Sequence, residues 1–117
     1  KSKSIPKCGD GENSMEIVDV RDAAKLMVNA AFENKARGII NIPSAGAISQ
    51  QQFLEKTAEV FDAQIVDFSR LYPGKVENAV IEAYTSNIVL ASKYPELFKE
   101  FEFSDLETSL RLLGKMI

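Results

Sequence analysis

The sequence has 117 residues, of which 45% are hydrophobic and 26% charged, so it is long enough for one domain with its own core. A net charge of −3 without a basic stripe offers nucleic acid no binding surface, and the absence of histidine removes the most common general base and metal ligand. A single cysteine, Cys8, excludes an internal disulfide and a structural zinc site. We expect no membrane contact and a cytoplasmic location, because the chain lacks a long apolar run and a signal peptide.

The N-terminal part predicts a turn followed by a strand. Residues 1–14 are polar and contain two glycines, so we expect a flexible N-terminal segment. Residues 17–20 are apolar and β-branched, which is typical of a strand. In that strand Val20 would point inward, while Asp19 and Arg21 would face solvent.

The next segment predicts a helix followed by a second strand. Asp22 stands directly before apolar residues at helical spacing, so we expect it to be the N-cap of a helix over residues 22–34. Residues 38–43 form a β-branched run that ends in proline, which indicates a strand. A strand, a helix and a strand in this order favour a parallel sheet.

The middle of the chain predicts a second helix, a strand and a turn. Ser49 and Gln52 have the spacing of a capping box, which favours a helix over residues 49–61. Residues 65–68 indicate a third strand, and residues 72–75 contain Pro and Gly in the order that a tight turn requires.

The C-terminal part predicts two more helices. Residues 76–84 fit a helix and a strand equally, whereas residues 86–93 indicate a short helix. Ser104 and Glu107 suggest a second capping box, at the start of a last helix that extends through Leu113. Three phenylalanines precede this helix and are expected in the core or on a docking face: Phe98, Phe101 and Phe103.

Several of these segments match a known family in order and spacing. Residues 9–24 read G-D-G-E-N-S-M-E-I-V-D-V-R-D-A-A and resemble the "GDG…V-x-V-x-D-x-A" stretch of the NAD(P)-dependent epimerase/dehydratase family, the extended short-chain dehydrogenases/reductases. Further matches are the "G-x-x-N-I" strand at 38–42, the "S-x-x-E-L" helix at 49–61, the "R-P-G-D" turn at 72–75, the "D-x-S-K-A" helix at 86–95 and the closing "S-L-E-E-G-L" helix at 103–113. The resemblance implies an α/β fold with a small, mainly parallel sheet and about four helices, the C-terminal substrate-binding lobe of a Rossmann-type enzyme. We expect this lobe to comprise residues 15–117.

The chain lacks the catalytic motifs of the family that it resembles. It contains neither the G-x-x-G-x-x-G turn that holds the cofactor pyrophosphate nor a Tyr-x-x-x-Lys pair. We therefore assign no catalytic, cofactor-binding or metal-binding residue and expect the chain to be inactive in isolation. The resemblance implies that NAD or NADP binds to an N-terminal Rossmann domain outside these residues, and it leaves a homodimer open.

The candidate substrate-binding residues are Arg70, Tyr72, Lys75 and Asn41. Two arginines that hold a nucleotide diphosphate in related epimerases are replaced here by Met15 and Tyr72. Arg70 and Lys75 provide cations beside the 72–75 turn, and the resemblance places Asn41 near the core of the lobe. The lost arginines favour a smaller or differently charged sugar-like substrate over a nucleotide-diphosphate sugar.

Two functions remain open on the sequence alone. The first is a substrate-binding lobe of an epimerase, dehydratase or reductase that acts on a sugar or a related carbonyl or hydroxyl compound. The second is a non-enzymatic protein-interaction module, which the lost arginines favour. If the chain is one lobe of a larger enzyme, some of the three phenylalanines should be exposed in isolation and promote self-association.

Overall fold

The strands form two pairs. The computed structural model describes residues 3–32, 37–42, 44, 46–74, 82, 85–86 and 98–117. Strand β1 (Lys3–Lys7) runs parallel to β4 (Ala63–Asp67), with Lys3 opposite Ala63 and Lys7 opposite Asp67. Strand β2 (Ser14–Glu16) runs antiparallel to β3 (Ala47–Ser49).

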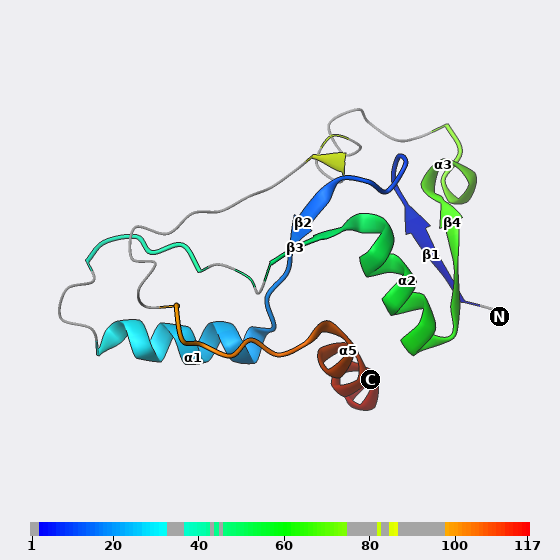
Figure 1. Cartoon of the computed structure of the whole chain (residues 1–117). Coiled ribbons are helices and arrows are strands. Elements are labelled where there is room, and N and C mark those ends of the chain that lie inside the picture. Colours follow the sequence, from blue (N-terminus) through cyan, green and yellow to red (C-terminus); the bar gives the residue numbers. More distant parts are fainter. Residues whose placement is uncertain are drawn as a thin grey trace.

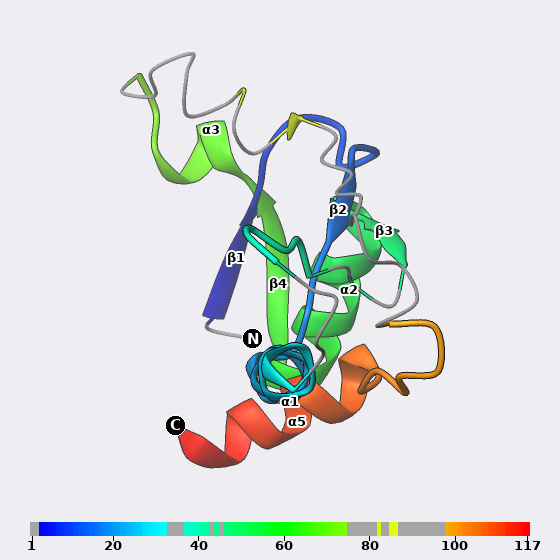
Figure 2. The same cartoon turned by 90° about the vertical axis from the view of Figure 1, so that its left-hand side faces the viewer.

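Helix α2 organises the molecule around the parallel pair. It spans Gln50–Phe61, packs on β1 and β4, and also contacts α5 (Leu106–Met116), as Figures 1 and 2 show. The short helix α3 (Phe68–Leu71) follows β4 directly, and α1 (Val20–Ala31) extends away from the parallel pair (Figure 1). A parallel strand pair with four helices among the described residues confirms the expected α/β class.

The core is small and contains a buried polar link. Its buried apolar side chains are Cys8, Leu26, Leu54, Ala58, Ala63, Phe98 and Leu110. The Gln50 side chain accepts a hydrogen bond from the backbone N–H of Cys8 and donates to the Cys8 carbonyl, both at 2.9 Å. It also donates to Asn13 Oδ1 at 2.7 Å. This link fixes the turn between β1 and β2 onto the N-terminus of α2, because its hydrogen bonds satisfy polar groups that are buried in the core.

The second helix and the strand after it confirm the sequence analysis. Ser49 is the N-cap of α2, and its capping box with Gln52 is complete in both directions. Asp62 ends the helix in the left-handed conformation, with φ of 50°. β4 then begins at Ala63, two residues before the expected start.

The predicted first strand and the first helix cap are both wrong by several residues. The strand forms at Ser14–Glu16, and α1 begins at Val20 with Asp19 as its N-cap. Asp22 lies inside the first turn and is buried, while Val20 faces solvent. A cap requires extended backbone before a helical turn, and Asp19 has that conformation with φ of −66° and ψ of 134°.

The predicted strand at 38–43 does not form within the described residues 37–42. The parallel pair arises from β1 instead, within the N-terminal segment that we expected to be flexible. A run of β-branched residues is not sufficient to form a strand, because a strand also needs a partner with free backbone groups.

The last helix begins one residue later than its predicted capping box. Asp105, not Ser104, caps α5 by accepting a hydrogen bond from the Thr108 N–H at 2.7 Å. Phe98 is buried, and the Phe101 and Phe103 rings meet edge to face with centroids 4.9 Å apart. The predicted helix at 86–93 lies outside the described residues apart from Ser86, and so does most of 76–84.

Candidate functional site

An open groove of about 450 Å³ runs along the parallel strand pair, from Ser4 and Gln64 to the carboxyl ends of the strands and on to helix α3. Because β1 and β4 run in the same direction, their last residues, Lys7 and Asp67, lie opposite each other at one edge of the sheet. Helix α3 then closes one side of this edge. The groove is lined by Ser4, Lys7, Gln64, Ile65, Val66, Asp67, Arg70 and Leu71.

The groove combines two cations, one carboxylate and two neutral polar side chains. Within the described part of the chain, no ion pair engages Lys7, Asp67 or Arg70. The Gln64 amide donates a hydrogen bond to Ser4 Oγ at 3.3 Å across the strand pair. Cations beside a carboxylate provide donors for an anionic group and an acceptor for hydroxyl groups, which suits a polar ligand.

The structure brings only part of the predicted site together. Arg70 lines the groove, and Tyr72 follows α3 with its ring 4.8 Å from that of Phe68. Asn41 belongs to the segment 37–42, which lies far from α3 in Figure 1. Lys75 lies outside the described residues. The sequence analysis missed Lys7, whose position in the groove depends on a strand 60 residues away.

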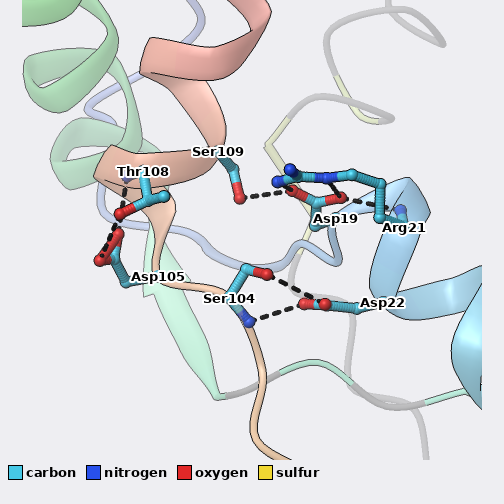
Figure 3. Close-up of polar contacts among 7 residues, drawn as sticks. All are labelled: Asp19, Arg21, Asp22, Ser104, Asp105, Thr108 and Ser109. Atoms are coloured by element: carbon cyan, nitrogen blue, oxygen red, sulfur yellow. Dashed lines mark hydrogen bonds and ion pairs between the residues drawn. The ribbon is translucent and has the colours of Figure 1, made fainter.

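Two carboxyl groups with lowered pKa values lie outside the groove, at the starts of α1 and α5 (Figure 3). The Arg21 guanidinium and the Ser109 hydroxyl donate to Asp19, and these hydrogen bonds hold the pKa of that carboxyl far below its usual range. The backbone N–H and the hydroxyl of Thr108 lower the pKa of Asp105 in the same way. Both carboxylates cap helices, so their lowered pKa values reflect structural roles and not proton transfer.

Asp22 joins two parts of the chain that are distant in sequence. Its carboxylate accepts hydrogen bonds from the backbone N–H of Ser104 at 2.7 Å and from the Ser104 hydroxyl at 3.0 Å (Figure 3). Together with the bond from Ser109 to Asp19, this contact ties the start of α1 to the segment that leads into α5. Asp19, expected to face solvent, is therefore a structural residue.

Among the described residues, the glycine turn at Gly9 and Gly11 differs from the glycine-rich turn of a dinucleotide-binding site in the element that follows it. The glycines of the turn at Gly9 and Gly11 have positive φ values, but the turn leads into strand β2 and not into a helix N-terminus. In the described residues as a whole, no cluster of three or more metal-ligating side chains occurs. Burial raises the pKa of the Cys8 thiol, which argues against a nucleophile at this position.

None of the described helices is both long and apolar enough to cross a bilayer.

The chain was compared with known protein families, curated proteins and solved structures. No protein-family model matches the chain, and no curated protein does either. A similar solved structure is the UDP-N-acetylglucosamine 4-epimerase from Methanobrevibacter ruminantium M1 in complex with UDP-N-acetylmuramic acid, with a TM-score of 0.60 and 17% identity. The match covers 97% of this chain and 36% of the epimerase, so the chain spans about a third of that enzyme's length. At this identity the likeness shows the fold, that of part of a Rossmann-type epimerase.

Proposed function

We propose that this chain is the substrate-binding part of an epimerase, dehydratase or reductase that acts on a sugar or a related carbonyl or hydroxyl compound. The observation that carries the proposal is the groove along β1 and β4, which reaches the carboxyl ends of both strands and is lined there by Lys7, Asp67 and Arg70. Ligands of α/β proteins commonly bind at the carboxyl ends of parallel strands. The fold likeness to an epimerase, over 97% of the chain, supports the same assignment.

The groove would bind and orient the substrate without performing the reaction. Arg70 presents a planar guanidinium that can bind a phosphate or carboxylate through two parallel hydrogen bonds, and Lys7 adds a second positive charge. Asp67 can accept hydrogen bonds from sugar hydroxyl groups. Holding the substrate in one orientation is itself a large part of catalysis, because the entropy of positioning is then lost on binding and not in the chemical step. NAD or NADP would bind to a nucleotide-binding part of the polypeptide outside these residues.

Calorimetric titration of the natural polypeptide with UDP-N-acetylglucosamine tests the proposal. Loss of a charge-assisted hydrogen bond costs about 1.5–3 kcal/mol, so Arg70→Ala should weaken binding about 10-fold to 150-fold. Lys25→Ala is the matched control, because it removes one positive charge from α1, far from the groove (Figure 1). An equal loss of affinity in both variants would refute the groove assignment.

A second titration identifies the size of the substrate. N-acetylglucosamine 1-phosphate carries the sugar and one phosphate but lacks the nucleoside. Affinity for this compound equal to that for the UDP-sugar would support the smaller substrate that the replaced family arginines indicate. Failure of both compounds to bind would favour the alternative, a non-enzymatic interaction module.

A further inference from the structure

One long side of α1 is apolar and exposed. Val20 is 79% exposed, Met27 63% and Val28 56%, and the C-cap Phe32 is 83% exposed. The apolar residues of this side recur at the i, i+4, i+7, i+8 and i+11 positions, a spacing that places them in one stripe along a helix. We call this stripe the α1 apolar face; it comprises Val20, Ala24, Met27, Val28 and Ala31.

The α1 apolar face is distinct from the side that packs on the body of the molecule. Asp22 and Leu26, both only 2% exposed, lie on the side of α1 opposite to the α1 apolar face. Arg21, Lys25 and Asn29 form a polar side between the two. A soluble helix normally has one apolar side, so α1 is built for contact with two surfaces, and the described structure provides one of them.

The attachment of α1 is concentrated at its start. Hydrogen bonds join Asp22 to Ser104 and Asp19 to Ser109 (Figure 3), whereas the rest of the helix has little contact with the other described helices and strands. Its 12 residues span about 18 Å. A helix of this length is marginal in water without tertiary packing, so an additional packing partner would stabilise it.

The size of the α1 apolar face decides between two kinds of partner. A stripe about 18 Å long and about 10 Å wide has an area of roughly 200 Å². A stable complex between free molecules buries about 800 Å² on each partner and must overcome the loss of translational freedom. A second part of the same polypeptide is held at a high effective concentration, so a smaller contact suffices. The area therefore favours an intramolecular partner over a second copy of the chain.

We propose that the α1 apolar face is the docking surface for the nucleotide-binding part of the same polypeptide. This inference rests on the proposed function, in which that part lies outside these residues. The epimerase match is consistent with it, because nearly two thirds of that chain lie outside the matched region, whereas only 3% of this chain does. The small side chains of Ala24 and Ala31 allow a partner surface to approach the α1 backbone closely.

Thiol labelling of the natural polypeptide tests the proposal. Met27→Cys places a thiol in the α1 apolar face, and Lys25→Cys places a matched thiol on the polar side of the same helix. Cys8 is buried and its pKa is raised, so it should react slowly with a maleimide. Labelling of the parent protein, without either substitution, measures this background rate. We expect Met27→Cys to react about tenfold or more slowly than Lys25→Cys in the native protein, and both to react equally in urea.

Three outcomes would overturn the proposal. The first is equal labelling of the two native variants, which would mean that the α1 apolar face is open to solvent. The second is protection of Met27→Cys that rises with protein concentration, since a second copy would then be the partner. The third is a natural polypeptide without a nucleotide-binding part. Titration of the same variants with UDP-N-acetylglucosamine separates the two proposals, because groove binding can persist when docking at α1 fails.

Discussion

The contact between Asp22 and Ser104 gives the sharpest test of the structure. Asp22→Ala removes a buried carboxylate that accepts hydrogen bonds from the backbone N–H and the hydroxyl of Ser104. Hydrogen bonds to a charged group contribute about 1.5–3 kcal/mol each, and the Ser104 N–H would be left without this acceptor. We therefore expect the free energy of unfolding to fall by about 3 kcal/mol. At this chain length, that corresponds to a decrease of about 12 °C in Tm.

The double variant distinguishes this contact from a simple helix cap. Ser104→Ala removes only the hydroxyl and should cost about 1 kcal/mol. In Asp22→Ala/Ser104→Ala the two losses should not add, because both variants break the same hydrogen bond; we expect a coupling energy of about 1 kcal/mol. Were Asp22 an N-cap, as its sequence context suggests, Asp22→Ala would cost about 1 kcal/mol and would not couple to Ser104.

Urea unfolding followed by far-UV circular dichroism measures these free energies. Lys25→Ala, on the exposed polar side of α1, is the control and should change the free energy of unfolding by less than about 0.5 kcal/mol. A coupling energy within about 0.3 kcal/mol of zero would refute the reasoning, since contacting residues that share a hydrogen bond must couple.

Two further predictions concern acid stability and the turn between β1 and β2. Because the pKa of Asp19 is lower in the folded protein than in the unfolded chain, where it is about 3.9, the ionised carboxylate stabilises the fold at higher pH, and this stabilisation is lost as the pH falls below that value. In Asp19→Asn the free energy of unfolding should therefore decrease less steeply with falling pH. The same decrease in the free energy of unfolding at low pH in both proteins would contradict this. A Cβ at Gly11 (φ 78°) would lie 3.1 Å from Gln51 Oε1, whereas one at Gly74 (φ 74°) would meet nothing within 4 Å. Gly11→Ala should therefore cost about 1 kcal/mol more than Gly74→Ala in urea unfolding, and equal costs would exclude the close approach.

Local signals in the sequence predicted α2 well. Ser49 and Gln52 satisfy each other's neighbouring backbone groups, so the start of this helix depends on four consecutive residues and little else. The start of α1 could not be predicted in the same way. Asp19 and Asp22 are both suitable N-caps by residue type, and the choice depends on Ser104 and Ser109, which bind the two carboxylates from more than 80 residues away.

The candidate groove was predictable only in part, for the same reason. Arg70 stands next to a turn, and the resemblance to a family draws attention to that turn. Lys7 lies in a polar segment with weak strand propensity, and it reaches the groove only because Ile5 and its neighbours pair with β4. Strand pairing of this kind is determined by tertiary context, which overrides weak local propensity. The segment 38–42 shows the converse case, since its β-branched residues form no strand.

The parallel pairing of β1 with β4 also affects how the chain is made and how it folds. Ser4 and Gln64 are hydrogen-bonded partners although they lie 60 residues apart. At about 5–20 residues per second, a ribosome synthesises β1 about 3–12 seconds before β4 exists. Closing a loop of this length costs about 3.6 kcal/mol of chain entropy, which favours late formation of the pair. The groove is therefore expected to be among the last features to form on the nascent chain, and until then the backbone groups of β1 are open to incorrect pairing with other chains.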